Sequence, residues 1–248
     1  MRYTDRPEAG RRLARSLEQL RGQDVVVLGL PRGGVPVAHE VAVALGVPLD
    51  VLVVRKLGVP WQPELAFGAV GENGMLVLND AVLEELPLDP DRRERVVENE
   101  RAELDRRVRR YRQGRDRLPV VGRTVVVVDD GLATGATAEA ACRVVRGLGA
   151  ARIVLAVPVG PTQTIDRLRA VADQVVCPQP VHRLGSVGSW YDDFAQVADA
   201  EVIALLARAT GGPPARRGRR GRGRHRARRV PGWCSRDRGP HPTASGSS

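Results

Sequence analysis

The chain has 248 residues, of which 42% are hydrophobic and 27% are charged, a composition typical of a soluble globular protein with a hydrophobic core. No apolar run approaches the roughly 20 residues of a membrane-spanning helix, and the charged N-terminal segment does not resemble a secretory signal. Three widely spaced cysteines favour neither a disulfide framework nor a zinc site. We therefore expect a cytoplasmic protein that does not enter a membrane.

The net charge of +10 comes from the C-terminal end of the chain. Residues 212–248 contain eleven arginines and one acid, and the rest of the chain has equal numbers of basic and acidic side chains. The same segment is rich in Gly, Ser and Pro and cannot form a packed core. We expect one folded domain over 1–211 and a disordered basic tail over 212–248. Nucleic acid is expected at most as a nonspecific partner of the tail.

The first half of the chain alternates apolar, β-branched runs with helical patterns. The segment 55–66 contains Gly58, Pro60 and Pro63 and is expected to lack regular structure. The predicted elements, in chain order, are a short helix within 11–20, a strand at 24–30, a helix at 35–46, a strand at 49–54, and two short strands at 67–70 and 75–78 around a turn at 72–74.

The second half begins with a long, densely charged helix and then continues the alternation. The predicted elements are that helix over 91–113, a strand at 124–128, a helix ending near 148, a strand at 152–158, a helix near 161–171, a strand near 173–176 and a last helix over 196–209. The charged helix is expected to pack along one edge of the domain, or alternatively to form a homodimer contact. The predicted fold class is α/β, with a mostly parallel central sheet and helices on both faces.

The strongest functional pattern is VVVVDDGLATGAT, at residues 125–137. It predicts a buried strand, a loop of small residues and the start of a helix. Such a loop directs backbone N–H groups into one concavity, where the helix N-terminus adds partial positive charge, so it suits a phosphate. The hydroxyl groups of Thr134 and Thr137 can donate to the same phosphate oxygens, and Gly131 and Gly135 permit a close approach.

Two acids, Asp129 and Asp130, stand immediately before this loop. Carboxylates repel a phosphate, but they suit vicinal hydroxyl groups and, directly or through water, a divalent cation. A phosphate, a diol and a cation together describe a ribose 5-phosphate. The loop lacks the Gly-Lys-Ser/Thr of a Walker A motif, and it does not fit the GxGxxG fingerprint of dinucleotide-binding folds.

Residues 125–137 closely resemble the phosphoribosyl pyrophosphate (PRPP) motif of type I phosphoribosyltransferases. The resemblance implies that Asp129 and Asp130 contact the ribose hydroxyls, act in catalysis and hold Mg²⁺, directly or through water. It also implies a 5-phosphate site formed by Gly131, Ala133, Thr134, Gly135, Ala136 and Thr137.

The family also places a pyrophosphate-binding loop after its first core strand, often with a strained or cis peptide. The matching residues are Pro31, Arg32, Gly33 and Gly34, where Arg32 supplies a cation for the leaving group. A mobile loop follows the second strand in the family, and segment 55–66 matches it. Lys56, or Arg55 beside it, is the predicted cation of that loop at the departing pyrophosphate.

A variable hood selects the acceptor base in this family, and residues 176–197 are the candidate here. They contain Trp190, Tyr191 and Phe194, and aromatic rings of this kind can stack on a heterocycle. Trp190 and Tyr191 are the predicted acceptor-binding residues. Because neighbouring side chains of an extended segment point to opposite sides, one ring is expected to face the ligand and the other to pack inward. We expect Tyr191 to be the ligand-facing ring.

The predicted function is that of an Mg²⁺-dependent pentosyltransferase. Such an enzyme transfers ribose 5-phosphate from PRPP to a small heterocyclic acceptor, a compound of the nucleobase type, with release of pyrophosphate. A non-catalytic regulatory protein that binds PRPP or a nucleotide is the alternative. The sequence does not identify the acceptor.

Overall fold

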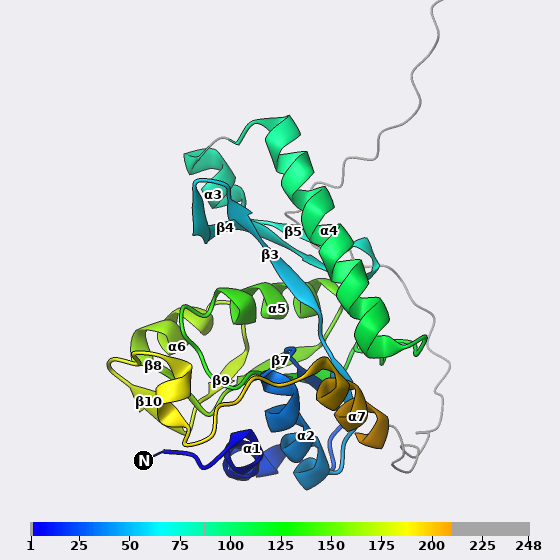
Figure 1. Cartoon of the computed structure of the whole chain (residues 1–248), viewed down its shortest axis with the longest axis vertical. Coiled ribbons are helices and arrows are strands. Elements are labelled where there is room, and N and C mark those ends of the chain that lie inside the picture. The colour runs from blue at the N-terminus through cyan, green and yellow to red at the C-terminus, as the bar shows by residue number, and fades with distance from the viewer. Residues whose placement is uncertain (1, 87, 210–248) are drawn as a thin grey trace, which may run out of the picture. The chain divides into compact units, whose positions relative to one another are not determined.

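The computed structural model describes residues 2–86 and 88–209, in which five parallel strands form the central sheet (Figure 1). Each strand pairs in parallel with its neighbours. This arrangement confirms the predicted α/β fold class. In spatial order the strands are β2 (Leu49–Val51), β1 (Val25–Gly29), β6 (Thr124–Val128), β7 (Arg152–Ala156) and β9 (Gln174–Val176).

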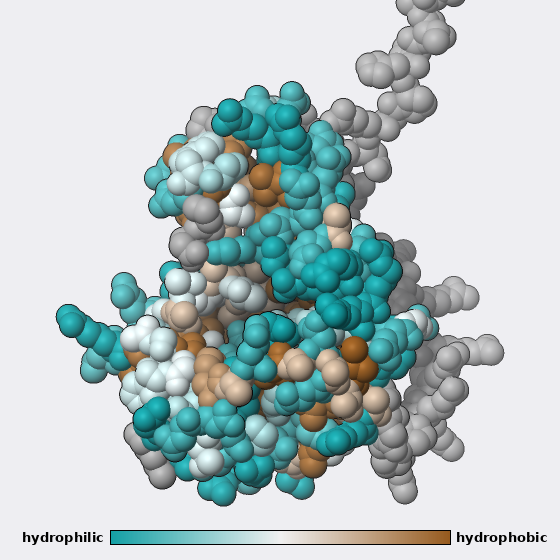
Figure 2. Space-filling model, in the orientation of Figure 1, coloured by the Kyte–Doolittle hydropathy of each residue, from teal (hydrophilic) through white to brown (hydrophobic). Residues whose placement is uncertain are grey.

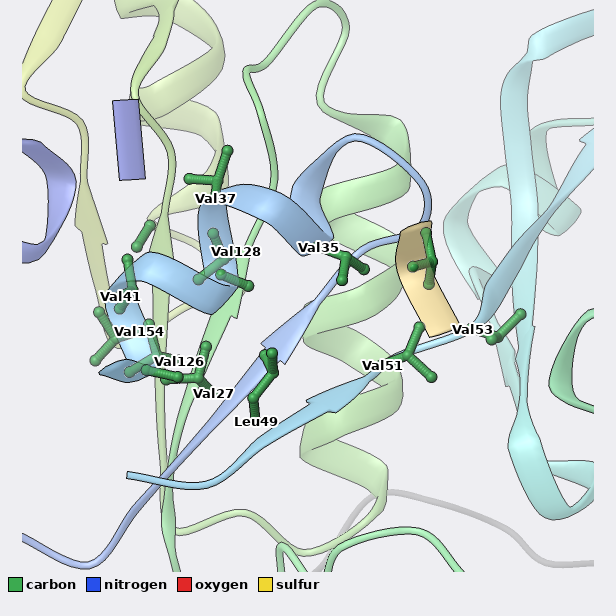
Figure 3. Close-up of a cluster of buried hydrophobic side chains, with 14 of the residues drawn as sticks. Val27, Val35, Val37, Val41, Leu49, Val51, Val53, Val126, Val128 and Val154 are labelled. Atoms are coloured by element: carbon green, nitrogen blue, oxygen red, sulfur yellow. The ribbon is translucent and has the colours of Figure 1, made fainter. Parts of the chain in front are cut away.

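Side chains alternate between the two faces of this sheet, and a hydrophobic core covers each face. On β1, Val25 and Val27 pack into one core and Val26 and Leu28 into the other. The strands are therefore apolar along their whole length, as is usual for parallel strands covered on both sides. Figure 3 shows the first core, where valines of α2 meet those of β1 and β6. This core includes residues of α1 (Arg6–Arg15), α2 (Gly34–Leu45) and α7 (Asp199–Ala209), and the other includes residues of α5 (Ala136–Gly147) and α6 (Thr162–Leu168).

A hairpin occupies the segment in which we expected no regular structure. Strands β3 (Val54–Val59) and β4 (Gln62–Gly71) pair antiparallel, and β5 (Leu76–Leu78) pairs with β4. The prediction for 55–66 is therefore wrong. The register of the pair shifts around Gly58, which leaves residues 63–65 of β4 outside the paired positions. A bulge of this kind tolerates a proline, because its residues need not donate a ladder hydrogen bond.

The long charged helix is α4 (Pro90–Arg112), which follows the short helix α3 (Asp80–Glu85). Asp89 caps α4, because its Oδ1 accepts a hydrogen bond from the Arg92 amide at 3.0 Å. The helix buries Val97, Leu104 and Tyr111 in the first core, while Figure 2 shows that its visible surface is almost entirely hydrophilic. The edge-packed helix is thus confirmed, and the homodimer contact stays a prediction.

The C-terminal end of α4 is fixed by a buried ionic cluster. Arg112 Nη1 lies 2.9 Å from Asp50 Oδ2 on β2, and Arg112 Nε lies 2.8 Å from Glu72 Oε2 in the turn after β4. All three side chains are buried. Removing one member would leave an uncompensated buried charge, so the cluster holds α4 and the antiparallel sheet to the central sheet.

The N-terminal segment forms a strap along the hood. Helix α1 begins at Arg6 rather than within 11–20, since Asp5 caps it by accepting from the Glu8 amide at 2.7 Å. Residues 2–5, which we call the strap, run beside residues 190–193. The Tyr3 amide donates to the Trp190 carbonyl at 2.8 Å, and the Tyr3 carbonyl accepts from the Asp192 amide at 2.8 Å.

The hood contains the short strand β10 (Gln179–Val181), which pairs in parallel with β8 (Val159–Pro161), and a 3-10 turn over Val187–Trp190. Further 3-10 turns lie at Glu18–Leu20 and Glu72–Gly74. In the described part of the chain, no helix is both long enough and apolar enough to cross a membrane. The tail predicted over 212–248 lies outside the described residues.

Candidate active site

The two predicted ligand-binding loops follow neighbouring strands of the central sheet. Gly29 at the end of β1 is paired with Val128 at the end of β6. The loop of residues 30–33 and the loop of residues 129–135 therefore leave the sheet side by side. Ligands of open parallel sheets bind at such carboxyl edges.

Close packing between these loops requires Gly33 in the first loop and Gly34 at the start of α2. A Cβ atom built on Gly33 would lie 1.9 Å from Asp130 Oδ2, and one built on Gly34 would lie 2.6 Å from the Val128 carbonyl oxygen. The peptide bond between Pro31 and Arg32 is cis. The loop matched to pyrophosphate thus lies directly against the acid pair.

The acid pair is half-buried and electrostatically unequal. Burial raises the pKa of Asp129, and the neighbouring Asp130 carboxylate raises it further. Burial also raises the pKa of Asp130, but the guanidinium of Arg6 opposes this shift. Asp129 Oδ1 accepts a hydrogen bond from the Asp130 amide at 2.9 Å. Two carboxylates in this setting favour a cation or hydroxyl donors as ligands.

The predicted phosphate loop opens into helix α5 as expected. Gly135 precedes the helix with φ +77°, a left-handed conformation that favours glycine. It has no side chain to cap the helix, and the Ala136 amide makes only a long contact of 3.4 Å with the Thr134 hydroxyl oxygen. Ala133, Thr134 and Thr137 are exposed. The amide groups at this helix start are available to an anion, with the helix dipole adding to the attraction.

Side chains from α6 support the outer side of the phosphate loop. Arg167 donates to the Thr134 carbonyl oxygen, and the Thr164 hydroxyl donates to the Ala133 carbonyl at 3.4 Å. A cleft of about 350 Å³ adjoins the loop here. Its walls include apolar residues of β4 and β5, and its polar lining includes Glu139, Arg143 and Arg167.

Arg6 is a site residue that the sequence analysis missed. Its Nε lies 2.8 Å from Asp130 Oδ2, and its guanidinium carbon lies 3.8 Å from the centre of the Phe194 ring. The hydroxyl of Tyr191 donates to the backbone carbonyl of Asp130 at 2.6 Å. Helix α1, which follows the strap, and the hood therefore both reach the acid pair. No local pattern around Arg6 could have indicated this contact, since its partner lies 124 residues along the chain.

The hood aromatics are arranged differently from the prediction. Tyr191 is 1% exposed, and its ring centre lies 5.5 Å from that of Tyr3 and 5.0 Å from that of Phe194. The expectation that Tyr191 is the ligand-facing ring is therefore wrong. The ring is covered because Tyr3 of the strap packs against it, where we had expected an open cleft. Trp190 is half-buried, and its indole N–H donates to the Leu184 carbonyl at 3.0 Å.

The two cations predicted for segment 55–66 lie on the hairpin. Arg55 Nε pairs with Glu100 Oε2 of α4 at 2.5 Å. Lys56 is half-buried on β3, where it is paired in register with Ala69 of β4. The role of Lys56 at pyrophosphate stays a prediction.

An acid pair at the carboxyl edge of a parallel sheet, where the loops after β1 and β6 meet, defines an α/β protein with a candidate ligand site. The family model described as "Phosphoribosyl transferase domain" matches residues 2–188. The chain belongs to this family.

Two similar proteins are informative. A protein of Mycobacterium tuberculosis that carries phosphoribosyl transferase as a provisional name is 56% identical over 207 residues, which is 84% of this chain and 47% of that protein. The chain thus spans about half the length of the curated relatives it matches. The crystal structure of TT1426 from Thermus thermophilus superposes with a TM-score of 0.78 at 47% identity, covering 84% of this chain and 99% of that one.

Proposed function

We propose that this domain transfers ribose 5-phosphate from PRPP to a ring nitrogen of a small heterocyclic acceptor and releases pyrophosphate. The observation that carries the proposal is the packing of Gly33 and Gly34 on the two acids, which brings both anion-binding loops within reach of one ligand. A molecule with a phosphate at one end, a diphosphate at the other and hydroxyls between them matches this order of groups.

Each part of the site has a role in this reaction. The amides of residues 133–137 hold the 5-phosphate, and the carboxylates of Asp129 and Asp130 accept from the ribose hydroxyls. Arg32 and the amide of Gly33 stabilise the charge that develops on the leaving pyrophosphate, and Lys56 adds a second cation. The bond between C1 and the pyrophosphate oxygen breaks, and the acceptor nitrogen forms the new bond to C1.

The acid pair also fits Mg²⁺. This ion is usually held by one or two carboxylates together with substrate phosphates, rather than by a complete set of protein ligands. Among the described residues no group of three or more potential ligands surrounds a metal position, so Asp129 and Asp130 would hold the ion jointly with the diphosphate. When bound, it neutralises charge on the leaving group.

The direct test incubates the full chain with PRPP, Mg²⁺ and a panel of purine and pyrimidine bases while pyrophosphate is measured. We expect release with at least one base and its loss in Asp129→Asn/Asp130→Asn, which should also weaken Mg-PRPP binding in calorimetry without unfolding the protein. PRPP binding with no turnover on any base would favour the regulatory alternative. Unchanged PRPP affinity in the double variant would overturn the site assignment.

A further inference from the structure

The guanidinium of Arg6 is fixed on several sides. The side chain is 10% exposed, its Nε pairs with Asp130 Oδ2 at 2.8 Å, and its Nη1 donates to the Ala195 carbonyl at 2.8 Å. The Phe194 ring covers one face of the guanidinium plane at 3.8 Å. Because both a hydrogen-bonded edge and a face are held, the group cannot rotate without breaking several contacts.

Asp130 is held just as closely. Its carboxylate lies against Gly33, and its backbone carbonyl accepts from the Tyr191 hydroxyl at 2.6 Å. Arg6 Nε donates to Oδ2 of this carboxylate, while the Asp130 amide donates to Oδ1 of Asp129. In the described part of the chain these bonds engage one oxygen of each acid, which leaves the other oxygen of each for a ligand. Two carboxylate oxygens from neighbouring residues suit the two hydroxyls of a vicinal diol.

We propose that Arg6 is a positioning residue that orients the Asp130 carboxylate toward a sugar hydroxyl and thereby makes the site selective for phosphorylated sugars with a vicinal diol. This inference rests on the proposed function, because it assigns the acid pair to the ribose. It adds the strap and α1 to the substrate site, although neither contains a residue of the two loops. A purely structural ion pair would contribute to stability without affecting the choice of sugar.

The test compares two small ligands that need no turnover. The dissociation constants of ribose 5-phosphate and 2,3-dideoxyribose 5-phosphate are measured by calorimetry on the full chain, with inorganic phosphate as a probe of the loop alone. We expect the wild type to prefer the diol by about tenfold or more, the range for hydrogen bonds to a charged acceptor. Arg6→Gln should reduce this preference to nearly one, and Arg6→Lys should restore part of it. Phosphate affinity should be the same in all three proteins.

Two further variants separate positioning from folding. Arg12→Gln removes a second arginine of α1, one that stacks on the Tyr3 ring 5.3 Å away, and should leave the sugar preference unchanged. If Arg6 acts through Asp130, the preference for ribose 5-phosphate over its dideoxy analogue should be no lower in the double variant Arg6→Gln/Asp130→Asn than in Asp130→Asn alone.

The outcomes distinguish the two proposals. A wild type that binds phosphate but does not distinguish the two sugars would overturn the assignment of the acid pair to ribose, and the proposed function with it. A wild type that prefers the diol, together with an Arg6→Gln variant that keeps the full preference, would overturn the role of Arg6 alone. Loss of phosphate binding in Arg6→Gln would also count against positioning, since the variant would then have disturbed the whole site.

Discussion

The loops at the strand ends hold the acid pair mainly through the backbone, whereas α1 and the hood hold it through side chains. Gly33 and Gly34 contact the acids because they have no side chain. Arg6 and Tyr191 contact Asp130 by a guanidinium and a phenol that are both buried. The first region tolerates almost no added volume, and the second requires large side chains. The difference shows that one ligand site depends on two opposite kinds of packing.

The largest effect on ligand affinity is expected where volume is added to the backbone region. Gly33→Ala places a methyl group 1.9 Å from Asp130 Oδ2, so the loop or the carboxylate must shift. A displacement of this size should reduce PRPP affinity by about 100-fold, as measured by calorimetry.

Gly147→Ala on α5 is the matched control for this substitution. Its new methyl group would lie 3.1 Å from the sulfur of Met75, at the flexible end of that side chain, and it should leave PRPP affinity unchanged. Equal affinity in Gly33→Ala and in the wild type would show that the two loops are not packed as described.

In the side-chain region, the largest effect is expected from removing a ring. Tyr191→Ala empties a site that is 1% exposed and should lower the free energy of unfolding by about 3–5 kcal/mol. Tyr191→Phe keeps the ring and loses only the hydrogen bond to Asp130, which should cost about 1 kcal/mol. Urea unfolding measures both variants. A stable Tyr191→Ala protein with a raised acceptor KM would restore the ligand-facing assignment of this ring.

The same contrast explains which parts could be predicted from sequence. The predicted phosphate loop is a short, continuous pattern, so the strand before it and the helix after it could be predicted directly from Asp129 to Thr137. The contact between Arg6 and Asp130 joins residues 124 positions apart, and it depends on where the strap crosses the hood. Likewise, the prolines of 55–66 suggested a loop. The bulge that makes them compatible with a hairpin could not be foreseen, because it arises only when β3 and β4 pair.

A smaller effect is expected at Trp190, the remaining candidate for stacking on an acceptor. Trp190→Ala should raise the acceptor KM by an amount equivalent to about 1–3 kcal/mol, the range for stacking of a base on an aromatic ring. PRPP affinity should hardly change. Steady-state kinetics with the base identified in the panel measures both. An unchanged acceptor KM would move the search for the base site to the exposed Trp61 at the turn of the hairpin.

The smallest effect is expected from the ionisation of Tyr3 in the strap. Burial raises the pKa of Tyr3 from 10.0 to about 12. The folded state therefore holds this proton more tightly than the unfolded state does, so the contribution to stability is complete below pH 10 and is lost as the pH rises toward 12. Tyr3→Phe lacks this proton, and its free energy of unfolding should fall less steeply between pH 10 and 12, by at most about 2 kcal/mol. Parallel slopes for the two proteins in urea unfolding across this range would contradict the burial of the Tyr3 hydroxyl, which donates to the Pro158 carbonyl at 2.9 Å. Tyr3 lies only three residues before Arg6. The loss of stability between pH 10 and 12 should therefore also weaken the preference of the site for a vicinal diol.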